Sequence, residues 1–370
     1  MLLSPETQPL KPTPFTQTRN KIMAVSKFLS SLLRTPILPT AHSIRNNVIP
    51  AVETETASIG RSAAGKSTFF TAMNLVAADQ HMRSGLRFST GNGTDPGAVI
   101  DLLNTTRQRI KDLADTGLPS TLESTVASYN LFEGAERRVH WQMWESVGQV
   151  LTSPNENPRV KQKYQAYISM IKRTDCIWVF APLPCAQIGA SQFDYDVKVA
   201  AAYLNHAVGL ERNKGQKCSV ALILTKIDGT FADQHEARQT LTDDLLISAL
   251  GPLVNICVTN DNVEAAVIAP TSAMGFGQTE ALPDRGQPVG HDNDFDVASM
   301  LNDEPTYTLK DGATMTPFNV SGLLYWTILK GILAQSVNTT NGQSQAMTRI
   351  VKKLRQDLAE SDPWLVRIKD

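Results

Sequence analysis

The chain of 370 residues is long enough for one large domain or two ordinary ones, and its 42% of hydrophobic residues can supply a sizeable core. Its 35 basic and 36 acidic side chains leave a formal net charge of −1, so no global excess of charge drives binding to nucleic acid or anionic lipid. No stretch approaches the roughly 20 consecutive apolar residues that span a bilayer. The cysteines show neither CxxC spacing nor a nearby histidine pair, which argues against a zinc site and a dense disulfide framework and predicts a cytoplasmic location.

Residues 1–47 are predicted to form a basic, partly disordered extension, because they are rich in Pro, Thr and Ser and contain a single acidic residue, Glu6. Within them, "TRNKIMAVSKFLSSLLR" places apolar residues at helical spacing with basic residues between them, which indicates an amphipathic helix. Three interpretations stay open: a helix that contacts a membrane or a partner, an organelle transit peptide, or a helix that packs on the domain within a mostly disordered tail.

Residues 48–336 repeat the order strand, loop, helix, which predicts an α/β fold in three layers, with a mainly parallel central sheet flanked by helices. Strands are expected at 52–59 and in "VASYNLFEG", "RVHWQMWES", "CIWVFAPL", "SVALILTKID" and "AAVIAP". Helices are expected from Lys66 onward, at 96–115, 158–173 and 235–250, and in "DYDVKVAAAYLNHAVGLERN" and "VSGLLYWTILKGIL". Because the strand at 52–59 alternates in polarity, it is expected near the sheet edge or covered on one face only. Trp141 and Trp144 are interpreted as core residues.

Two segments interrupt or follow this pattern. Residues 276–318 are rich in Asp, Gly and Pro and are interpreted as an acidic, partly disordered loop insertion in the domain. Residues 337–370 are predicted to be a helical extension, in which "TRIVKKLRQDLAES" is an amphipathic helix that docks on the domain or on a partner.

The stretch "GRSAAGKST" satisfies the pattern G-x-x-x-x-G-K-[ST] between a predicted strand and a predicted helix. In such a loop the glycines let backbone amides surround phosphate oxygens, Lys66 neutralises the outer phosphates, and the Ser67 hydroxyl binds Mg²⁺. The expected phosphate contacts are Gly60, Arg61, Ser62, Ala63, Ala64, Gly65, Lys66, Ser67 and Thr68.

A second motif, "LTKIDG", follows the apolar strand "SVALI", so its side chains would lie at the carboxyl end of a strand, where ligands bind in open α/β sheets. Guanine presents two adjacent N–H donors that one carboxylate accepts together, and Asp228 could do so while the stem of Lys226 lies along the ring. The alternative is an ordinary polar turn after a strand.

The order "GRSAAGKST", "PSTLEST", "WESVGQ", "TKID" and "PTSAMG" resembles the five ordered elements of the translation-factor-related (TRAFAC) class of P-loop GTPases with a Ras-like core, over about residues 50–275 and the closing helix. The resemblance implies the P-loop NTPase fold and guanine recognition by Thr225, Lys226 and Asp228. It also implies that the Ser272 and Ala273 loop meets the base, with Met274 where Lys is frequent. The extended segment between the helix after the glycine-rich loop and "PSTLEST", together with "LPSTLE", resembles divergent bacterial GTPases of defence-related conflict systems.

The remaining motifs concern the γ-phosphate. In "PSTLEST" the resemblance implies a Mg²⁺-binding switch threonine, either Thr121 or Thr125, of which Thr121 is favoured because it follows the Pro-Ser turn. "WESVGQ" departs from the family's Asp-x-x-Gly by placing Glu145 in the Asp position, while Gly148 is kept and can meet the γ-phosphate. Gln149 matches the position that orients the hydrolytic water, so Gln149 and Lys66 are the predicted catalytic residues.

These motifs predict a protein that binds GTP and GDP with Mg²⁺, hydrolyses GTP slowly, and acts as a nucleotide-dependent switch for protein partners, without a nucleic-acid ligand. Two alternatives remain. Glu145 leaves open a scaffold that binds GTP without hydrolysing it, and an ATP-dependent kinase or ATPase would share the first loop alone. The N-terminal helix is the candidate contact with a membrane or a partner.

Overall fold

The computed structural model describes residues 51–60, 64–79, 82–90, 125–145, 165, 167–183, 190–210, 216–281, 307–310, 313–335 and 341–370. By its contacts the chain divides into residues 1–48 and 49–370, and everything described here belongs to the second unit. The predicted N-terminal extension and the predicted helix at 96–115 therefore lie outside the described residues.

An eight-stranded sheet organises this unit, in the spatial order β10-β7-β6-β5-β1-β4-β3-β2. The five neighbouring strands β7, β6, β5, β1 and β4 run parallel, whereas β10, β3 and β2 pair antiparallel with their neighbours. The strands are β1 (Val52–Ile59), β2 (Leu86–Thr90), β3 (Thr125–Glu133), β4 (Glu136–Glu145), β5 (Cys176–Pro182), β6 (Cys218–Thr225), β7 (Val263–Pro270) and β10 (Val366–Lys369). The predicted α/β class, with a mainly parallel sheet flanked by helices, is confirmed.

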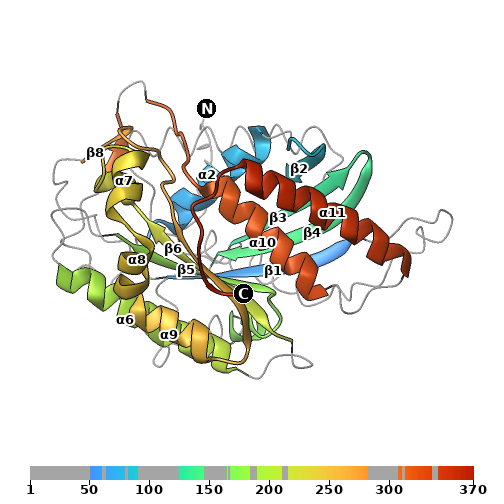
Figure 1. Cartoon of the computed structure of the whole chain (residues 1–370), viewed down its shortest axis with the longest axis horizontal. Coiled ribbons are helices and arrows are strands. Elements are labelled where there is room, and N and C mark those ends of the chain that lie inside the picture. Colours follow the sequence, from blue (N-terminus) through green and yellow to red (C-terminus); the bar gives the residue numbers. More distant parts are fainter. Residues whose placement is uncertain are drawn as a thin grey trace, which may run out of the picture. The chain divides into compact units, whose positions relative to one another are not determined.

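Helices cover both faces of the sheet (Figure 1). One face carries α2, α10 and α11, and the other carries α6, α8 and α9. The helices are α2 (Lys66–Asp79), α6 (Ala190–Gly209), α7 (Gln234–Thr240), α8 (Asp243–Ala249), α9 (Gly251–Thr259), α10 (Val320–Gln335) and α11 (Asn341–Glu360). Among the helices that the structure describes, none combines the length and apolar character needed to cross a membrane.

The position of β1 corrects the prediction for residues 52–59. This strand lies in the middle of the sheet between β5 and β4, and not near an edge. Its alternation comes from small polar side chains that are buried and hydrogen-bonded instead of exposed: Thr56 accepts a hydrogen bond from Trp141 Nε1 at 2.9 Å. Next to it, Thr54 lies where α10 crosses closely, because a Cβ on Gly331 would be 2.1 Å from Thr54 Oγ1. Polarity along a strand therefore does not establish exposure when donors and acceptors are paired internally.

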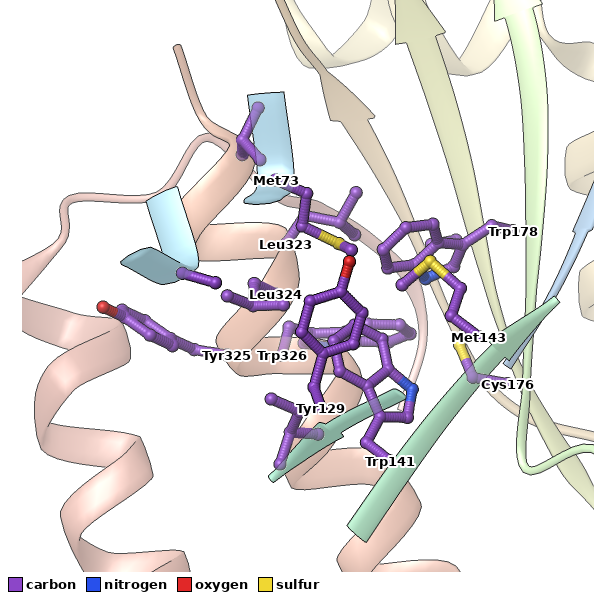
Figure 2. Packing of buried hydrophobic residues seen from close by; sticks show 14 of the residues in the cluster. Met73, Tyr129, Trp141, Met143, Cys176, Trp178, Leu323, Leu324, Tyr325 and Trp326 are labelled. Carbon is purple, nitrogen blue, oxygen red and sulfur yellow. The ribbon is translucent and has the colours of Figure 1, made fainter. Parts of the chain in front are cut away.

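Large aromatic side chains fill the core between the sheet and α2, α10 and α11 (Figure 2). Trp141 on β4 and Trp178 on β5 meet edge to face with their ring centroids 5.9 Å apart. The indole N–H of Trp178 donates to Thr327 on α10 at 2.9 Å, so the one polar atom of this ring is satisfied inside the core. Trp141 is fully buried as predicted, whereas Trp144 packs at the margin of the other core.

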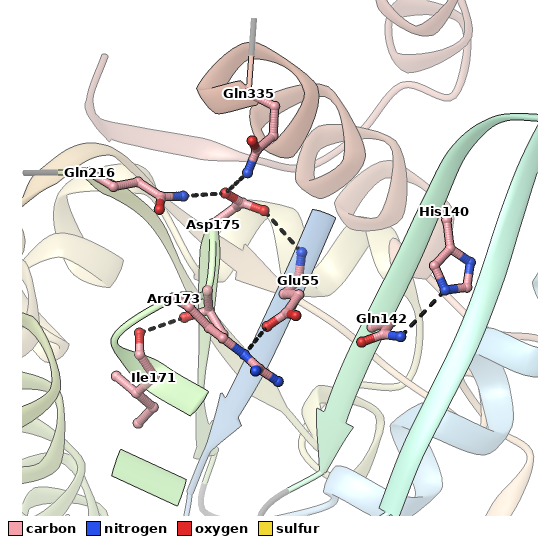
Figure 3. A network of polar contacts seen from close by, with 9 residues as sticks. Glu55, His140, Gln142, Ile171, Arg173, Asp175, Gln216 and Gln335 are labelled. Carbon is pink, nitrogen blue, oxygen red and sulfur yellow. Dashed lines mark hydrogen bonds and ion pairs between the residues drawn. The ribbon is translucent and has the colours of Figure 1, made fainter. Parts of the chain in front are cut away.

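The buried carboxylate of Asp175 joins β1, β5 and α10 at the end of the sheet where β5 begins (Figure 3). Asp175 accepts hydrogen bonds from the amide N–H of Glu55 at 3.0 Å, from Gln216 Nε2 at 2.6 Å and from Gln335 Nε2 at 2.8 Å. Glu55 in turn pairs with Arg173 at 2.8 Å. Burial nevertheless raises the pKa of Glu55, although the Arg173 charge opposes that shift. This network fixes the start of β5 beside the middle of β1.

The C-terminal segment is integrated into the same unit. Helix α11 packs on α10, and β10 adds an antiparallel strand to β7, which the sequence analysis did not predict. Two side chains of α11 also bind the segments next to β2 and β3. Lys353 pairs with Glu133 at the β3–β4 turn at 2.9 Å, and the buried Asp357 accepts from the amide and hydroxyl of Ser84, just before β2. The predicted amphipathic helix therefore docks on the domain.

Two further segments differ from the prediction. The single helix expected at 235–250 is divided into α7 and α8, because Thr242 adopts an extended conformation and its side chain accepts from the Leu245 amide as the N-cap of α8. In the segment 276–318, β8 (Thr279–Ala281) and β9 (Tyr307–Leu309) form a two-stranded antiparallel sheet at the two ends of residues 282–306, which lie outside the described part.

Candidate functional site

The candidate site lies at the edge of the sheet where the parallel strands β1, β5, β6 and β7 end. Three predicted segments lie at the ends of these strands: the glycine-rich loop after β1, "TKID", which begins with the last residue of β6, and "TSA" after β7. Because β6 lies two strands from β1 and next to β7, the fold brings together segments that are about 160 and 45 residues apart in the sequence.

The structure describes both ends of the glycine-rich loop, Gly60 and Ala64 onward, while Arg61, Ser62 and Ala63 lie outside the described residues. Gly60 passes so close to β5 that a Cβ would stand 2.9 Å from the Cβ of Phe180. Gly65 has a φ of +80°, a left-handed conformation that favours glycine, and it accepts the first helical hydrogen bond of α2 from the Phe69 amide at 2.9 Å. Both glycines of the motif are therefore required by the backbone.

Helix α2 begins at Lys66, as predicted, and no acidic side chain occupies its first turn. The Lys66 side chain is buried, and its Nζ donates to the Gly60 carbonyl at 2.7 Å, so it spans the loop from one end to the other. Ser67 and Thr68 follow in the first turn and are partly exposed. A cation next to a helix N-terminus, whose amides have no partner within the helix, is the arrangement that binds phosphate groups.

A hydrogen bond connects the loop directly with the "TKID" segment. Thr225, the last residue of β6, is buried and donates from Oγ1 to the Ala64 carbonyl at 2.9 Å. The same hydroxyl stands 3.5 Å from the position that a Cβ on Gly65 would occupy. The carbonyl of Thr225 accepts from the amide of Leu183, directly after β5, at 2.9 Å. Thr225 is therefore fixed by the β5 side and supports the glycine-rich loop at the same time.

The chain turns sharply after Thr225. Lys226 has φ 61° and ψ 25°, a left-handed conformation that costs a residue with a side chain on the order of 1 kcal/mol. This turn leads into a short 3₁₀ helix, Ile227–Gly229, in which Ile227 is buried and Asp228 is partly exposed. A strained backbone at this position is typical of a residue whose direction matters for ligand binding.

Asp228 meets the third segment. Burial raises the pKa of its carboxyl, while a hydrogen bond with the Ser272 side chain and the charge of Lys226 oppose that shift. Ser272 is fully buried and its Oγ accepts from the Gly275 amide at 2.7 Å, which fixes the orientation of its side chain. Ala273 is partly buried and packs against the core of the α10 face. The predicted base-reading carboxylate thus lies next to the loop that the sequence analysis paired with it.

Residues before α10 support this loop, and the sequence analysis missed them. Phe318 exchanges two backbone hydrogen bonds with Ser272, at 3.3 and 2.8 Å. Gly275 packs on Thr316 so closely that a Cβ would lie 2.1 Å from its hydroxyl. Asn319 adopts φ 60° and donates from Nδ2 to Pro270 and to Trp364, at 2.8 and 2.7 Å. The one available signal was an Asn directly before an apolar helix, which is typical of a helix cap.

The predicted γ-phosphate elements are described only in part. Glu145 ends β4, and its neighbour Trp144 is in register with Ala57 of β1, so the backbone at Glu145 arrives at the edge where the loop begins. Thr125 opens β3 directly opposite Glu145. The side chains of these two residues, and Thr121, Gly148 and Gln149 as a whole, lie outside the part of the chain that the structure describes.

Of the three predicted Mg²⁺ ligands, Ser67 alone has a described side chain. Its hydroxyl is a hard oxygen donor of the kind that Mg²⁺ prefers, and it stands beside Lys66 at the start of α2. Within the described residues, no group of three or more His, Cys, Asp and Glu side chains could hold a metal ion.

The sequence was also compared with known proteins. No model of a protein family matches the chain, and a search of the curated proteins finds no significant match.

Proposed function

We propose that the protein binds GTP and GDP at this edge of the sheet and hydrolyses GTP slowly with Mg²⁺, as a P-loop GTPase with a Ras-like core. The observation that carries the proposal is the connection of the three segments. Thr225 donates to Ala64 of the phosphate loop, and Asp228 follows it at the end of β6, beside Ser272 of the loop after β7. A lysine-containing loop and a fixed carboxylate thus stand at two ends of one site.

The topology supports the same proposal. The strand that precedes the loop is central, with parallel neighbours on both sides, so α2 starts at the carboxyl ends of the strands, where ligands bind in open α/β sheets. The antiparallel β3–β4 pair beside β1 brings the segment before Thr125 and the segment after Glu145 to that edge. These are the two segments for which the motif order predicts contacts with the γ-phosphate.

In this proposal the residues divide the nucleotide between them. Lys66 exchanges the Gly60 carbonyl for phosphate oxygens, and Asp228 accepts the two N–H donors of guanine. Ser67, with Thr121 and Glu145, would hold Mg²⁺, which supplies positive charge against the phosphates. Gln149 would orient the water. In this proposal the protein is a cytoplasmic switch that reports its nucleotide state to protein partners.

Nucleotide binding by the full chain tests the proposal. Fluorescent GDP should bind and be displaced by GTP and GDP but not by ADP or ATP. Asp228→Ala should lose this preference, whereas Asp261→Ala, at an exposed turn before β7, should keep it. Tight ADP binding would contradict the guanine assignment and favour the ATP-dependent alternative.

A second candidate, a scaffold that binds GTP without hydrolysing it, is favoured by the Glu145 substitution at the end of β4. Single-turnover hydrolysis of labelled GTP with Mg²⁺ separates the two candidates. Slow phosphate release that Gln149→Ala abolishes supports the GTPase. Tight GTP binding without any phosphate release supports the scaffold.

A further inference from the structure

A cavity lies away from the candidate nucleotide site, between α10, α11 and the edge strand β10. Its volume is about 510 Å³, and none of its lining residues belongs to the predicted nucleotide site. Eight of the thirteen lining residues are apolar: Val267, Trp326, Leu329, Leu333, Leu358, Ala359, Pro363 and Leu365. The cavity is therefore an opening in the layer between the sheet and the two C-terminal helices, which lie side by side in Figure 1.

The rim of this cavity is basic. Lys330, Arg355, Arg367 and Lys369 line it, against a single acidic residue, Asp370. Lys369 is engaged, because its Nζ donates to carbonyls at the end of α9 at 2.9 to 3.3 Å. Lys330 and Arg355 make no ion pair with any described residue, and they line the cavity from the α10 and α11 sides. The net charge at the rim is positive although the chain as a whole is nearly neutral.

The size and chemistry of the cavity define what would fit. Ligand sites typically have about 300–1,000 Å³, apolar walls and a few polar groups that fix orientation. About 150 Å³ of apolar cavity is enough for benzene, so this cavity admits a ligand several times larger. Apolar walls disfavour a nucleotide or a sugar. Cations at the opening favour an anionic group there, with the apolar part of the same molecule inside.

We propose that this cavity binds a single-chain anionic amphiphile from solution, a long-chain carboxylate or phosphate, with its chain against Trp326 and Leu358 and its head group between Lys330 and Arg355. The proposal is independent of the nucleotide site. A bilayer surface would engage the same cations without filling the cavity, so it is a separate outcome of the test.

Calorimetric titration of the full chain with dodecanoate, below its micelle concentration, provides the test. Saturable binding of one molecule per chain is expected, and the cationic dodecyltrimethylammonium should not bind. Lys330→Gln combined with Arg355→Gln should weaken dodecanoate binding at least about tenfold, because charge-assisted hydrogen bonds are lost. Lys352→Gln, an exposed change on α11 outside the cavity, should leave it unchanged.

A steric variant tests the apolar part. Ala359 lines the cavity from an exposed position, so Ala359→Trp should block dodecanoate, while Ala202→Trp at an exposed position of α6 should not. If Ala359→Trp fails to fold, the charge variant alone decides. Equal binding of both amphiphiles, or dodecanoate binding that neither cavity variant weakens, would overturn the proposal. So would binding to phosphatidylglycerol vesicles that needs Lys330 and Arg355 without any dodecanoate binding.

Discussion

The hydrogen bond from Thr225 to Ala64 is expected to hold the phosphate loop in its binding conformation. Thr225→Val keeps the shape of the side chain but removes the donor, so the buried Ala64 carbonyl loses its 2.9 Å partner. An unsatisfied buried acceptor costs about 1–3 kcal/mol. We therefore expect the free energy of unfolding to fall by that amount, measured by urea denaturation followed by circular dichroism.

The same loss should reach nucleotide binding. If the hydrogen bond favours the competent loop conformation by about 1–3 kcal/mol, its removal lowers the competent fraction and raises the apparent Kd for GDP about fivefold to 150-fold. Fluorescence titration with labelled GDP measures this change. The preference for GDP over ADP should persist, because Asp228 and Ser272 are not altered.

Thr174→Val is the matched control. Thr174 is also fully buried and donates to a carbonyl, Ile171 O at 3.0 Å, but it precedes β5 at the opposite end of the sheet. It should lose comparable stability with no change in the Kd for GDP. Equal Kd values for Thr225→Val and the wild type, despite the lost stability, would refute the idea that this bond shapes the loop.

Four further outcomes are expected. Affinity for GDP should rise with pH through the pKa of Asp228, which burial raises, because the ionised form accepts the guanine donors. Titrations from about pH 4 to about pH 7 should show this rise in affinity, and Asp228→Asn should remove the pH dependence. The hydrogen bond from Lys353, and the neighbouring charges, lower the pKa of Glu133. The contribution of Glu133 to stability is therefore complete above its ordinary pKa and is lost as the pH falls through the folded-state value. Urea unfolding should show that Glu133→Gln is about 1 kcal/mol less stable than the wild type at neutral pH and less sensitive to acid. Asp175→Ala leaves three donors without their acceptor and should cost about 3 kcal/mol in the same assay. Asn319→Ala should cost more than Asn319→Gly, because both lose the side-chain hydrogen bonds but glycine adopts φ 60° without strain, and thermal unfolding would contradict this reasoning if the order were reversed.

The sequence supported the fold class because its signals are local. Long apolar strands, such as Cys176–Pro182 and Cys218–Thr225, are buried along their whole length and were predicted within a few residues. The start of α2 at Lys66 was predicted as well, from the glycine-rich motif that precedes it, and Gly65 there has a positive φ. Each of these features depends on neighbours in the chain.

Features that depend on distant partners could not be predicted in the same way. The four residues of β10 form a strand because β7 offers a free edge, and not because "VRIK" is long enough to signal one. The central place of β1 was missed because Thr56 is paired with Trp141 on β4, which a polarity pattern does not contain. Asn319 likewise gains its role from Pro270 and Trp364, which lie 49 and 45 residues away.

The two ends of the candidate site differ in how their polar groups are satisfied. At the base end, Ser272 is fixed by Gly275 and Phe318, and Asp228 lies beside it, so guanine would meet groups that are held in place by the protein. At the phosphate end, Lys66 is satisfied by the Gly60 carbonyl of its own loop, and a phosphate must replace that bond. Selectivity for the base therefore rests on a preorganised pair, whereas affinity for the phosphates includes the cost of releasing Lys66 from Gly60. This difference is why Asp228 variants should change which nucleotide binds, and Thr225 variants should change how tightly it binds.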